Sequence, residues 1–225
     1  MTLPRATRPP LAQPTVCLIT DRTLAGDRPL EELVAEAVAG GVTMVQLREK
    51  DLSGDELLDL AQRIREAIGG DASLVINARV EVAVEVAAAG VHLPSDWLAT
   101  DFARWAVGPT MLIGRSVHSV AEATRAANEG MDYVEFGTIF PSRSHPGGAS
   151  QGLEPIRAAA AVGVPVIVVG GITAENAADV IAAGASGIAV ISAILADPNP
   201  RLAARQLADV VIEAWSLRRV TTGVV

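Results

Sequence analysis

Short hydrophobic runs alternate along the chain with longer stretches whose hydrophobic residues recur at helical spacing. Each run has the length of a β-strand, and most are hydrophobic on both faces. The runs are residues 16–20, 44–50, 73–78, 90–94, 111–117, 133–139, 165–171 and 187–193. The intervening stretches, such as LEELVAEAVAGG and SGDELLDLAQRIREAIGG, have the amphipathic pattern of helices. The pattern predicts eight β–α units, one after another.

Strands that are hydrophobic on both faces are typical of a parallel sheet covered by helices. Eight units in 225 residues predict a single-domain α/β protein, a (β/α)8 TIM barrel. The rival is an open doubly wound sheet, but no G-x-G-x-x-G sequence follows the first strand. We expect the barrel domain at residues 15–219, a flexible N-terminal tail at 1–14 and a C-terminal tail at 220–225.

The second hydrophobic run, MVQLREK at residues 44–50, carries an unusual polar face. Because side chains alternate along a strand, Gln46, Arg48 and Lys50 share one side. Inward residues near the carboxyl ends of barrel strands line the active-site mouth. We expect this face to bind an anion, although ion pairs with acidic residues on the rim would also explain it.

Other strand ends add candidate site residues. Asn77 ends the third strand, and Ser116 and His118 share a side of the fifth. A histidine at a strand end is placed as a general acid or base would be, and His118 is the candidate. His92, in the middle of a strand, is expected to be structural.

The loops after strands seven and eight predict a phosphate site. In barrels these loops often bind phosphate through backbone N–H groups near a helix N-terminus. Gly170 and Gly171 allow close approach of the backbone, and Ser192 adds a hydroxyl. A tight turn that needs positive φ is the alternative explanation for the glycines. The Gly-, Ser- and Pro-rich segment PSRSHPGGASQG, residues 141–152, is expected to be a mobile lid.

Composition excludes several classes of protein. The net charge is −8 with no run of Lys or Arg, which argues against nucleic acid or an anionic membrane as partner. No segment reaches the roughly 18 apolar residues of a membrane span, and residues 1–14 lack the hydrophobic core of a secretion signal. Cys17 is the single cysteine, so we expect a reducing, cytoplasmic location. No acidic, Cys or His spacing predicts a metal site.

Several segments together resemble the thiamine phosphate synthase/TenI superfamily, from about residue 16 to residue 215. They are QLREK (46–50), LVIN (74–77), GVHL (90–93), GRSVHS (114–119), DYVEFGTIFPS (132–142), VVGGITAEN (168–176) and GASGIAVISAI (184–194). The resemblance implies one of two enzymes. Thiamine phosphate synthase, a transferase, joins hydroxymethylpyrimidine diphosphate to thiazole phosphate with Mg²⁺. Thiazole tautomerase, an isomerase, aromatises thiazole carboxylate phosphate by a proton shift, without metal.

Three positions depart from the synthase pattern. Ala78 follows Asn77 where synthases carry a magnesium-binding Asp, and Trp97 stands where they carry the second one. Residues 141–145, PSRSH, lack the lysine of the pyrophosphate-binding Pro-Thr-x-Thr-Lys; its two threonines correspond to Ser142 and Ser144, expected to bind substrate.

These departures favour the tautomerase, with His118 as the acid and base, a small phosphorylated thiazole as substrate, and no cofactor. The synthase, with Mg²⁺, stays open because Gln46, Arg48 and Lys50 correspond to the residues that hold the pyrimidine diphosphate in synthases. A non-catalytic regulatory protein that binds thiazole phosphate is a further alternative. Superfamily members are often dimeric or trimeric, which makes a homo-oligomer possible.

Overall fold

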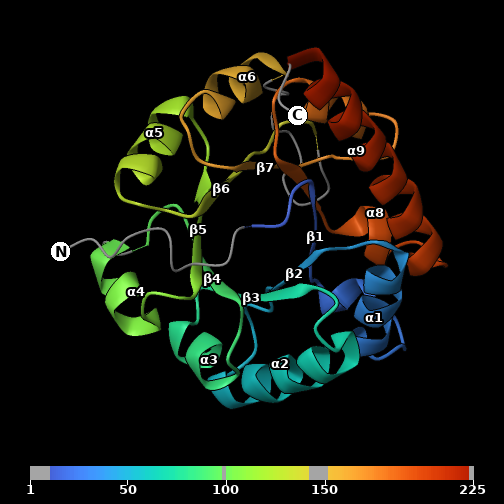
Figure 1. The fold of residues 1–225 in the computed structure, drawn as a ribbon. Helices are drawn as coiled ribbons and strands as arrows, with labels where there is room; N and C mark the ends of the chain where they lie inside the picture. Colours follow the sequence, from blue (N-terminus) through green and yellow to red (C-terminus); the bar gives the residue numbers. More distant parts are fainter. Residues whose placement is uncertain (1–10, 98–99, 142–151, 223–225) are drawn as a thin grey trace.

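The computed structural model describes residues 11–97, 100–141 and 152–222. Eight parallel strands form one closed barrel in the order of the sequence, and β1 pairs with β8 to close it. Helices surround the strands, as the view along the barrel in Figure 1 shows. The predicted single-domain (β/α)8 barrel is confirmed.

The strands are β1 Thr15–Ile19, β2 Met44–Leu47, β3 Ser73–Asn77, β4 Gly90–Leu93, β5 Leu112–Val117, β6 Tyr133–Phe136, β7 Val166–Val169 and β8 Gly187–Val190. The helices are η2 Arg22–Leu24, a 3-10 turn, and α1 Leu30–Gly40, α2 Gly54–Ile68, α3 Val80–Glu85, α4 Thr100–Val107, α5 Val120–Asn128, α6 Glu154–Ala160, α7 Ala177–Ala182, α8 Ser192–Leu195 and α9 Pro200–Thr222. Helix α9 includes residues 220–222, which the sequence pattern assigned to the C-terminal tail.

The alternation of side chains along the strands produces two hydrophobic layers. Outward residues such as Val45 and Leu47 pack beneath the helices in one large cluster. Inward residues form a smaller cluster inside the barrel, which includes Cys17, Met44 and Tyr133. The even-numbered residues of β2 therefore face the interior, as its alternation predicts.

The strands end earlier than the hydrophobic runs do. β2 ends at Leu47, and the backbone N–H of Arg48 donates to the Thr20 hydroxyl at 2.9 Å. A side chain thus replaces the neighbouring strand as acceptor, and the chain leaves the sheet at this point. Residues 48–50 belong to the loop that opens the barrel mouth.

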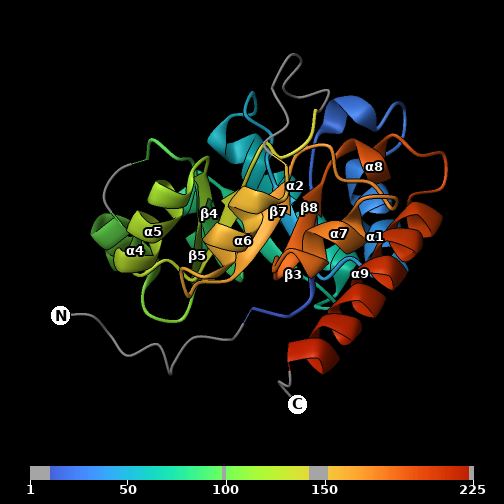
Figure 2. The same ribbon diagram turned by 90° about the horizontal axis from the view of Figure 1, so that it is seen from above.

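The barrel mouth lies on the side that carries α8, because α8 follows directly after β8. Figure 2 shows α8 and η2 on this side, while α9 runs from it towards the opposite side. Helix α9 packs against both α1 and α7 and so joins the last unit of the chain to the first. Within the described residues, no helix is long and apolar enough to cross a membrane.

Gly114 is required by the packing of the barrel interior. A Cβ atom at this position would lie 2.1 Å from Cζ of the fully buried Tyr133. The Tyr133 ring therefore lies directly against the Gly114 backbone. Since buried rings in a close-packed core have little room to move, any side chain at Gly114 has to displace this one.

We predict that Gly114→Ala lowers the free energy of unfolding by about 1–3 kcal/mol, the usual range for overpacking a core. Urea denaturation of the parent and the variant measures the difference. The matched control is Gly54→Ala at the half-buried start of α2, where the nearest atom to a Cβ is 3.9 Å away. An equal loss of stability in both variants would contradict the packing argument.

Candidate active site

A cavity of about 650 Å³ opens at the carboxyl ends of the strands. Its volume is typical of a small-molecule site. Most of the residues predicted from the strand ends line it. These are Gln46, Arg48, Lys50, Asn77, Ser116, His118, Gly170, Gly171 and Ser192. Ser142 and Ser144 lie outside the described residues.

One side of the cavity is cationic. Arg48 is half-buried and Lys50 is exposed, both directly after β2. The acidic residues on the rim are engaged elsewhere: Glu49 accepts from the backbone N–H of Arg22 at 3.2 Å, and Asp51 accepts from its guanidinium at 2.6 and 2.9 Å. In the described part of the chain, no ion pair joins Arg48 or Lys50 to an acidic residue. Both positive charges are therefore left to the cavity.

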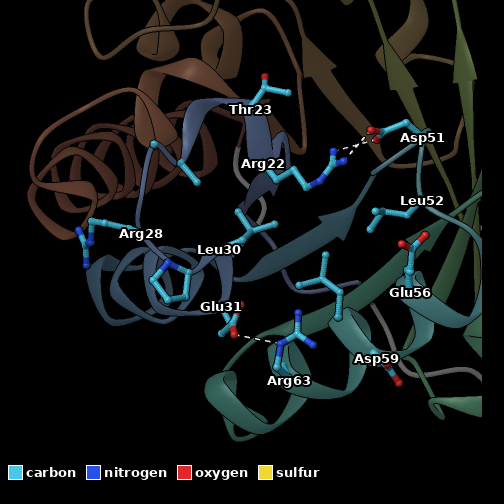
Figure 3. A pocket seen from close by; sticks show the side chains of 14 residues that line it. Arg22, Thr23, Arg28, Leu30, Glu31, Asp51, Leu52, Glu56, Asp59 and Arg63 are labelled. Atoms are coloured by element: carbon cyan, nitrogen blue, oxygen red, sulfur yellow. Dashed lines mark hydrogen bonds and ion pairs between the residues drawn. The ribbon is translucent and has the colours of Figure 1, made fainter.

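A second hollow of about 760 Å³ lies outside the mouth, between the η2–α1 segment and α2. Figure 3 shows Arg22 reaching Asp51 on one side of it and Arg63 reaching Glu31 on the other. These exposed charges neutralise one another in pairs, each of small energetic value. Although this hollow is larger, it has the character of a solvated surface groove, and the chemistry of the molecule lies in the mouth.

Deep in the mouth, four polar side chains form a buried cluster. Nε2 of His92 lies 2.8 Å from Oγ of Ser116 and 3.4 Å from a carboxyl oxygen of Glu135, and Nδ1 lies 3.3 Å from the Tyr133 hydroxyl. Burial, with the positive charges of Arg48 and Arg115, lowers the pKa of His92 to about 3. His92 is a neutral structural histidine.

Glu135 is buried in the same cluster, with 3% of its surface exposed. Burial raises the pKa of its carboxyl to about 8, while Arg48 and a hydrogen bond from Gln46 act in the opposite direction. Glu135 is therefore protonated at neutral pH. Because His92 is also neutral, their 3.4 Å contact is polar but is not an ion pair.

Strand alternation, used to place Gln46 and Ser116, also signals Glu135. The residue stands between Val134 and Phe136 in β6, on the side of Tyr133. An inward carboxyl in a buried strand needs a partner or a proton. Glu135 is nevertheless not among the residues predicted from the sequence, although its inward position on β6 identifies it.

His118 stands at the cavity opening, with an exposed side chain. Its Nδ1–H donates to the Gly137 carbonyl at 2.6 Å, which fixes the ring and leaves Nε2 as the other nitrogen. The backbone N–H of His118 donates to Glu122 at 2.8 Å, at the start of α5. The ring thus lies beside Ser116 at the mouth, as the strand parity predicts.

Gly170 and Gly171 follow β7 with φ of 103° and 64°. Both values favour glycine, and both positions are also crowded. A Cβ on Gly170 would lie 2.4 Å from the Thr138 side chain, and one on Gly171 would lie 2.5 Å from the Pro141 carbonyl oxygen. Turn geometry and close packing against the β6 loop therefore require both glycines, whatever binds above them.

The side chains that line the cavity do not supply the carboxylate ligands that a divalent metal ion needs. None of the residues outside the described ranges is Asp or Glu, so every carboxylate of the chain can be placed. Of these, only Glu135 lines the cavity, and it is protonated. Asp96 is exposed and does not line it. No group of three or more His, Cys, Asp or Glu that could hold a metal occurs in the described part of the chain.

The thiamine monophosphate synthase family model (TMP-TENI) matches residues 16–194. The chain belongs to this family. A thiamine-phosphate synthase of Methanoculleus marisnigri is 45% identical over 202 residues, which cover 88% of this chain and 95% of the relative. Another, from Roseiflexus castenholzii, is 40% identical over 207 residues and covers 91% of each chain. The predicted superfamily membership is confirmed.

Solved structures agree with this assignment. A thiamine phosphate pyrophosphorylase of Pyrococcus furiosus superposes with a TM-score of 0.81 at 35% identity and covers 89% of this chain and 96% of that one. A 3-hexulose-6-phosphate synthase reaches a TM-score of 0.67 at 19% identity, a likeness of fold alone.

The prediction of a thiazole tautomerase is wrong. Relatives at 40–45% identity over nearly their whole length are named thiamine-phosphate synthases, which favours the transferase alternative. Three differing positions say less about the reaction than similarity along some 200 residues does. The prediction of an enzyme is supported by these relatives, and the isomerase class is not.

The two buried groups make folding stability depend on pH in opposite directions. Glu135 titrates near 4.5 when unfolded and at about 8 when folded, so its contribution is present below pH 4.5 and is lost as the pH rises through 8. His92 titrates near 6.5 when unfolded and at about 3 when folded, so its contribution is lost as the pH falls through that window.

We predict that Glu135→Gln, which cannot ionise, gains stability relative to the parent between pH 5 and pH 8. The gain is at most about 1.4 kcal/mol per pH unit. Urea denaturation at pH 5, 6.5 and 8 measures it, with Glu85→Gln at an exposed position of α3 as the matched control. A difference between variant and parent that does not change with pH would show that Glu135 is already ionised in the folded chain.

Proposed function

We propose that this protein is a thiamine phosphate synthase that joins hydroxymethylpyrimidine diphosphate to thiazole phosphate. The observation that carries the proposal is the cationic pair Arg48 and Lys50 at the mouth of a barrel of this family. Among the described residues, no ion pair joins either of them to an acid. A reaction that expels pyrophosphate needs positive charge where the leaving group departs. The names of the relatives support the same activity.

In this reaction the thiazole nitrogen attacks the methylene carbon of the pyrimidine. The new C–N bond forms, the C–O bond to the diphosphate breaks, and the electron pair of that bond leaves with pyrophosphate. No proton moves to or from carbon. His118, expected to act as an acid and base in a tautomerase, therefore has no such role in this proposal, and we assign it to substrate binding.

The remaining predicted residues divide between the two substrates. Arg48 and Lys50 hold the diphosphate, and Gln46 and Asn77 lie next to them around the same part of the cavity. Gly170, Gly171 and Ser192 line the side formed by β7 and β8 and hold the phosphate of the thiazole. Fixing both phosphates aligns nitrogen and methylene carbon, which reduces the entropic cost of bringing two substrates together.

The resemblance to synthases implies Mg²⁺, which would neutralise the departing pyrophosphate. The residues present do not fit the two-carboxylate site of those enzymes, because Ala78 has no ligand atom and Trp97 replaces the second acid. We therefore assign charge neutralisation to Arg48 and Lys50 alone. The lone buried thiol of Cys17 is consistent with a cytoplasmic enzyme.

The first test is direct. Purified protein given both substrates should form thiamine phosphate and release pyrophosphate in equal amounts, measured by chromatography and a coupled phosphate assay. Formation of neither product, with or without added Mg²⁺, would overturn the proposal.

We predict that Arg48→Ala raises the KM for the pyrimidine diphosphate at least tenfold, because a charge-assisted hydrogen bond contributes about 1.5–3 kcal/mol. The KM for thiazole phosphate should change by less than about twofold. Arg63→Ala is the matched control, since Arg63 pairs with Glu31 outside the mouth. Equal effects of Arg48→Ala on both KM values would contradict the division of the cavity between the substrates.

A further inference from the structure

Two of the residues that line the bottom of the cavity each have a buried oxygen without a hydrogen-bond partner among the described residues. Oε1 of Gln46 and Oε1 of Glu135 are buried and make no hydrogen bond within the described part of the chain. Both side chains line the cavity, with 2% and 3% of their surface exposed. Burying a polar atom without a partner is costly, so such pairs occur where a ligand supplies the missing bond.

These two side chains face each other from opposite strands of the barrel. Gln46 belongs to β2 and Glu135 to β6, and the Gln46 amide hydrogen-bonds the Glu135 carboxyl. The amide also donates to Asn77 at 3.5 Å, a long bond. The N–H groups of Gln46 are thus directed towards protein acceptors, while its buried carbonyl oxygen has no partner within the described residues.

The charged and titratable groups around Glu135 come from four strands. Arg48 follows β2, His92 lies on β4, Tyr133 on β6 and Cys17 on β1. Burial lowers the pKa of His92 and raises those of Tyr133 and Cys17 well above their usual values, so these three stay neutral near pH 8. Lys50 and His118 line the cavity as well.

A protonated carboxyl offers one O–H donor and one acceptor, and the Gln46 carbonyl adds a second acceptor. An aminopyrimidine presents the complementary set: a ring nitrogen that accepts, beside an exocyclic amine that donates twice. We infer that Glu135 is a specificity-determining residue that, together with Gln46, recognises the amine and the adjacent ring nitrogen of the pyrimidine substrate. The inference rests on the proposed function and extends it to one residue and one edge of the ring.

Two observations favour the pyrimidine over the thiazole as the group bound here. Gln46 and Arg48 are two residues apart in the chain, and both line the cavity. A ring bound at Gln46 therefore has its diphosphate arm close to Arg48. The thiazole nitrogen, in contrast, is the attacking atom. A donor bound to that nitrogen would occupy the electron pair that the reaction requires.

The test compares two substitutions at one position. Glu135→Gln keeps a donor and an acceptor on a side chain of the same shape, whereas Glu135→Leu keeps only the volume. We expect Glu135→Leu to raise the KM for the pyrimidine diphosphate about 10- to 100-fold, with the KM for thiazole phosphate within about twofold of the parent. Glu135→Gln should stay within about threefold for both substrates.

The pH profile provides a second readout that a merely structural role would not change. In the parent, the KM for the pyrimidine diphosphate should rise above pH 8, because the carboxylate has lost its donor and repels the ring nitrogen. Glu135→Gln should lack this rise, because an amide does not ionise. Equal rises in parent and variant, or equal loss of affinity for both substrates in Glu135→Leu, would overturn the inference.

Direct binding separates this inference from the proposed function. Hydroxymethylpyrimidine without its diphosphate, and its analogue with an oxo group in place of the amine, are titrated calorimetrically into each protein. We expect the parent and Glu135→Gln to prefer the amine at least tenfold, and Glu135→Leu to lose the preference. If the parent prefers the amine as expected but the protein forms no thiamine phosphate, only the synthase activity is rejected. If the parent does not prefer the amine, the role of Glu135 is rejected.

Discussion

Closure of eight strands into a barrel forces every inward side chain either into a dry interior or into the mouth, and this constraint determines the site. The lower interior is filled by hydrophobic residues around Tyr133, whose ring leaves room only for Gly114 beside it. Directly above, inward positions carry His92, Ser116 and Glu135, which contact one another at the bottom of the cavity. His92 and Glu135 are buried there, and burial disfavours a charge on either. Both titratable members of this group lose their charge as a consequence.

Much of this arrangement can be predicted from period-two alternation alone. The same rule places Val45 and Leu47 under helices and directs Gln46, Ser116 and their neighbours to one cavity. Alternation predicts the side of the strand to which a side chain points, but it predicts neither how deeply that side chain is buried nor how far it lies from others. Alternation does not predict that Glu49 and Asp51 pair with Arg22 and so leave Arg48 and Lys50 to the cavity. That pairing joins η2 to the loop after β2, between residues 27 and 29 positions apart in the chain. The protonation of Glu135 likewise depends on burial that no local pattern contains.

The choice of enzyme within the family could not be made from single positions. Ala78 has no ligand atom, yet its backbone has a φ of 63°, a left-handed conformation in which Asn and Asp are enriched and Ala is rare. The turn after β3 therefore retains a geometry suited to an Asp at that position, and the departure from the synthase pattern is confined to a side chain. Loss of one ligand removes a contact, while the barrel, the cationic strand end and the glycine turn remain in place.

Charge distribution explains how a strongly acidic chain can present an anion site. The chain carries a net charge of −8, so the mean field around it repels phosphates. Pairing with Arg22 partly neutralises the two rim acids at the edge of the mouth, and protonation neutralises Glu135, the carboxyl that lines it. Arg48 and Lys50 then act at short range on a cavity that no ionised carboxylate lines among the described residues, and the half-buried Arg48 is partly shielded from solvent. In the proposed synthase, the neutral form of Glu135 would therefore serve both ends of the pyrimidine diphosphate: it would offer a donor to the ring and leave the nearby positive charges to the diphosphate.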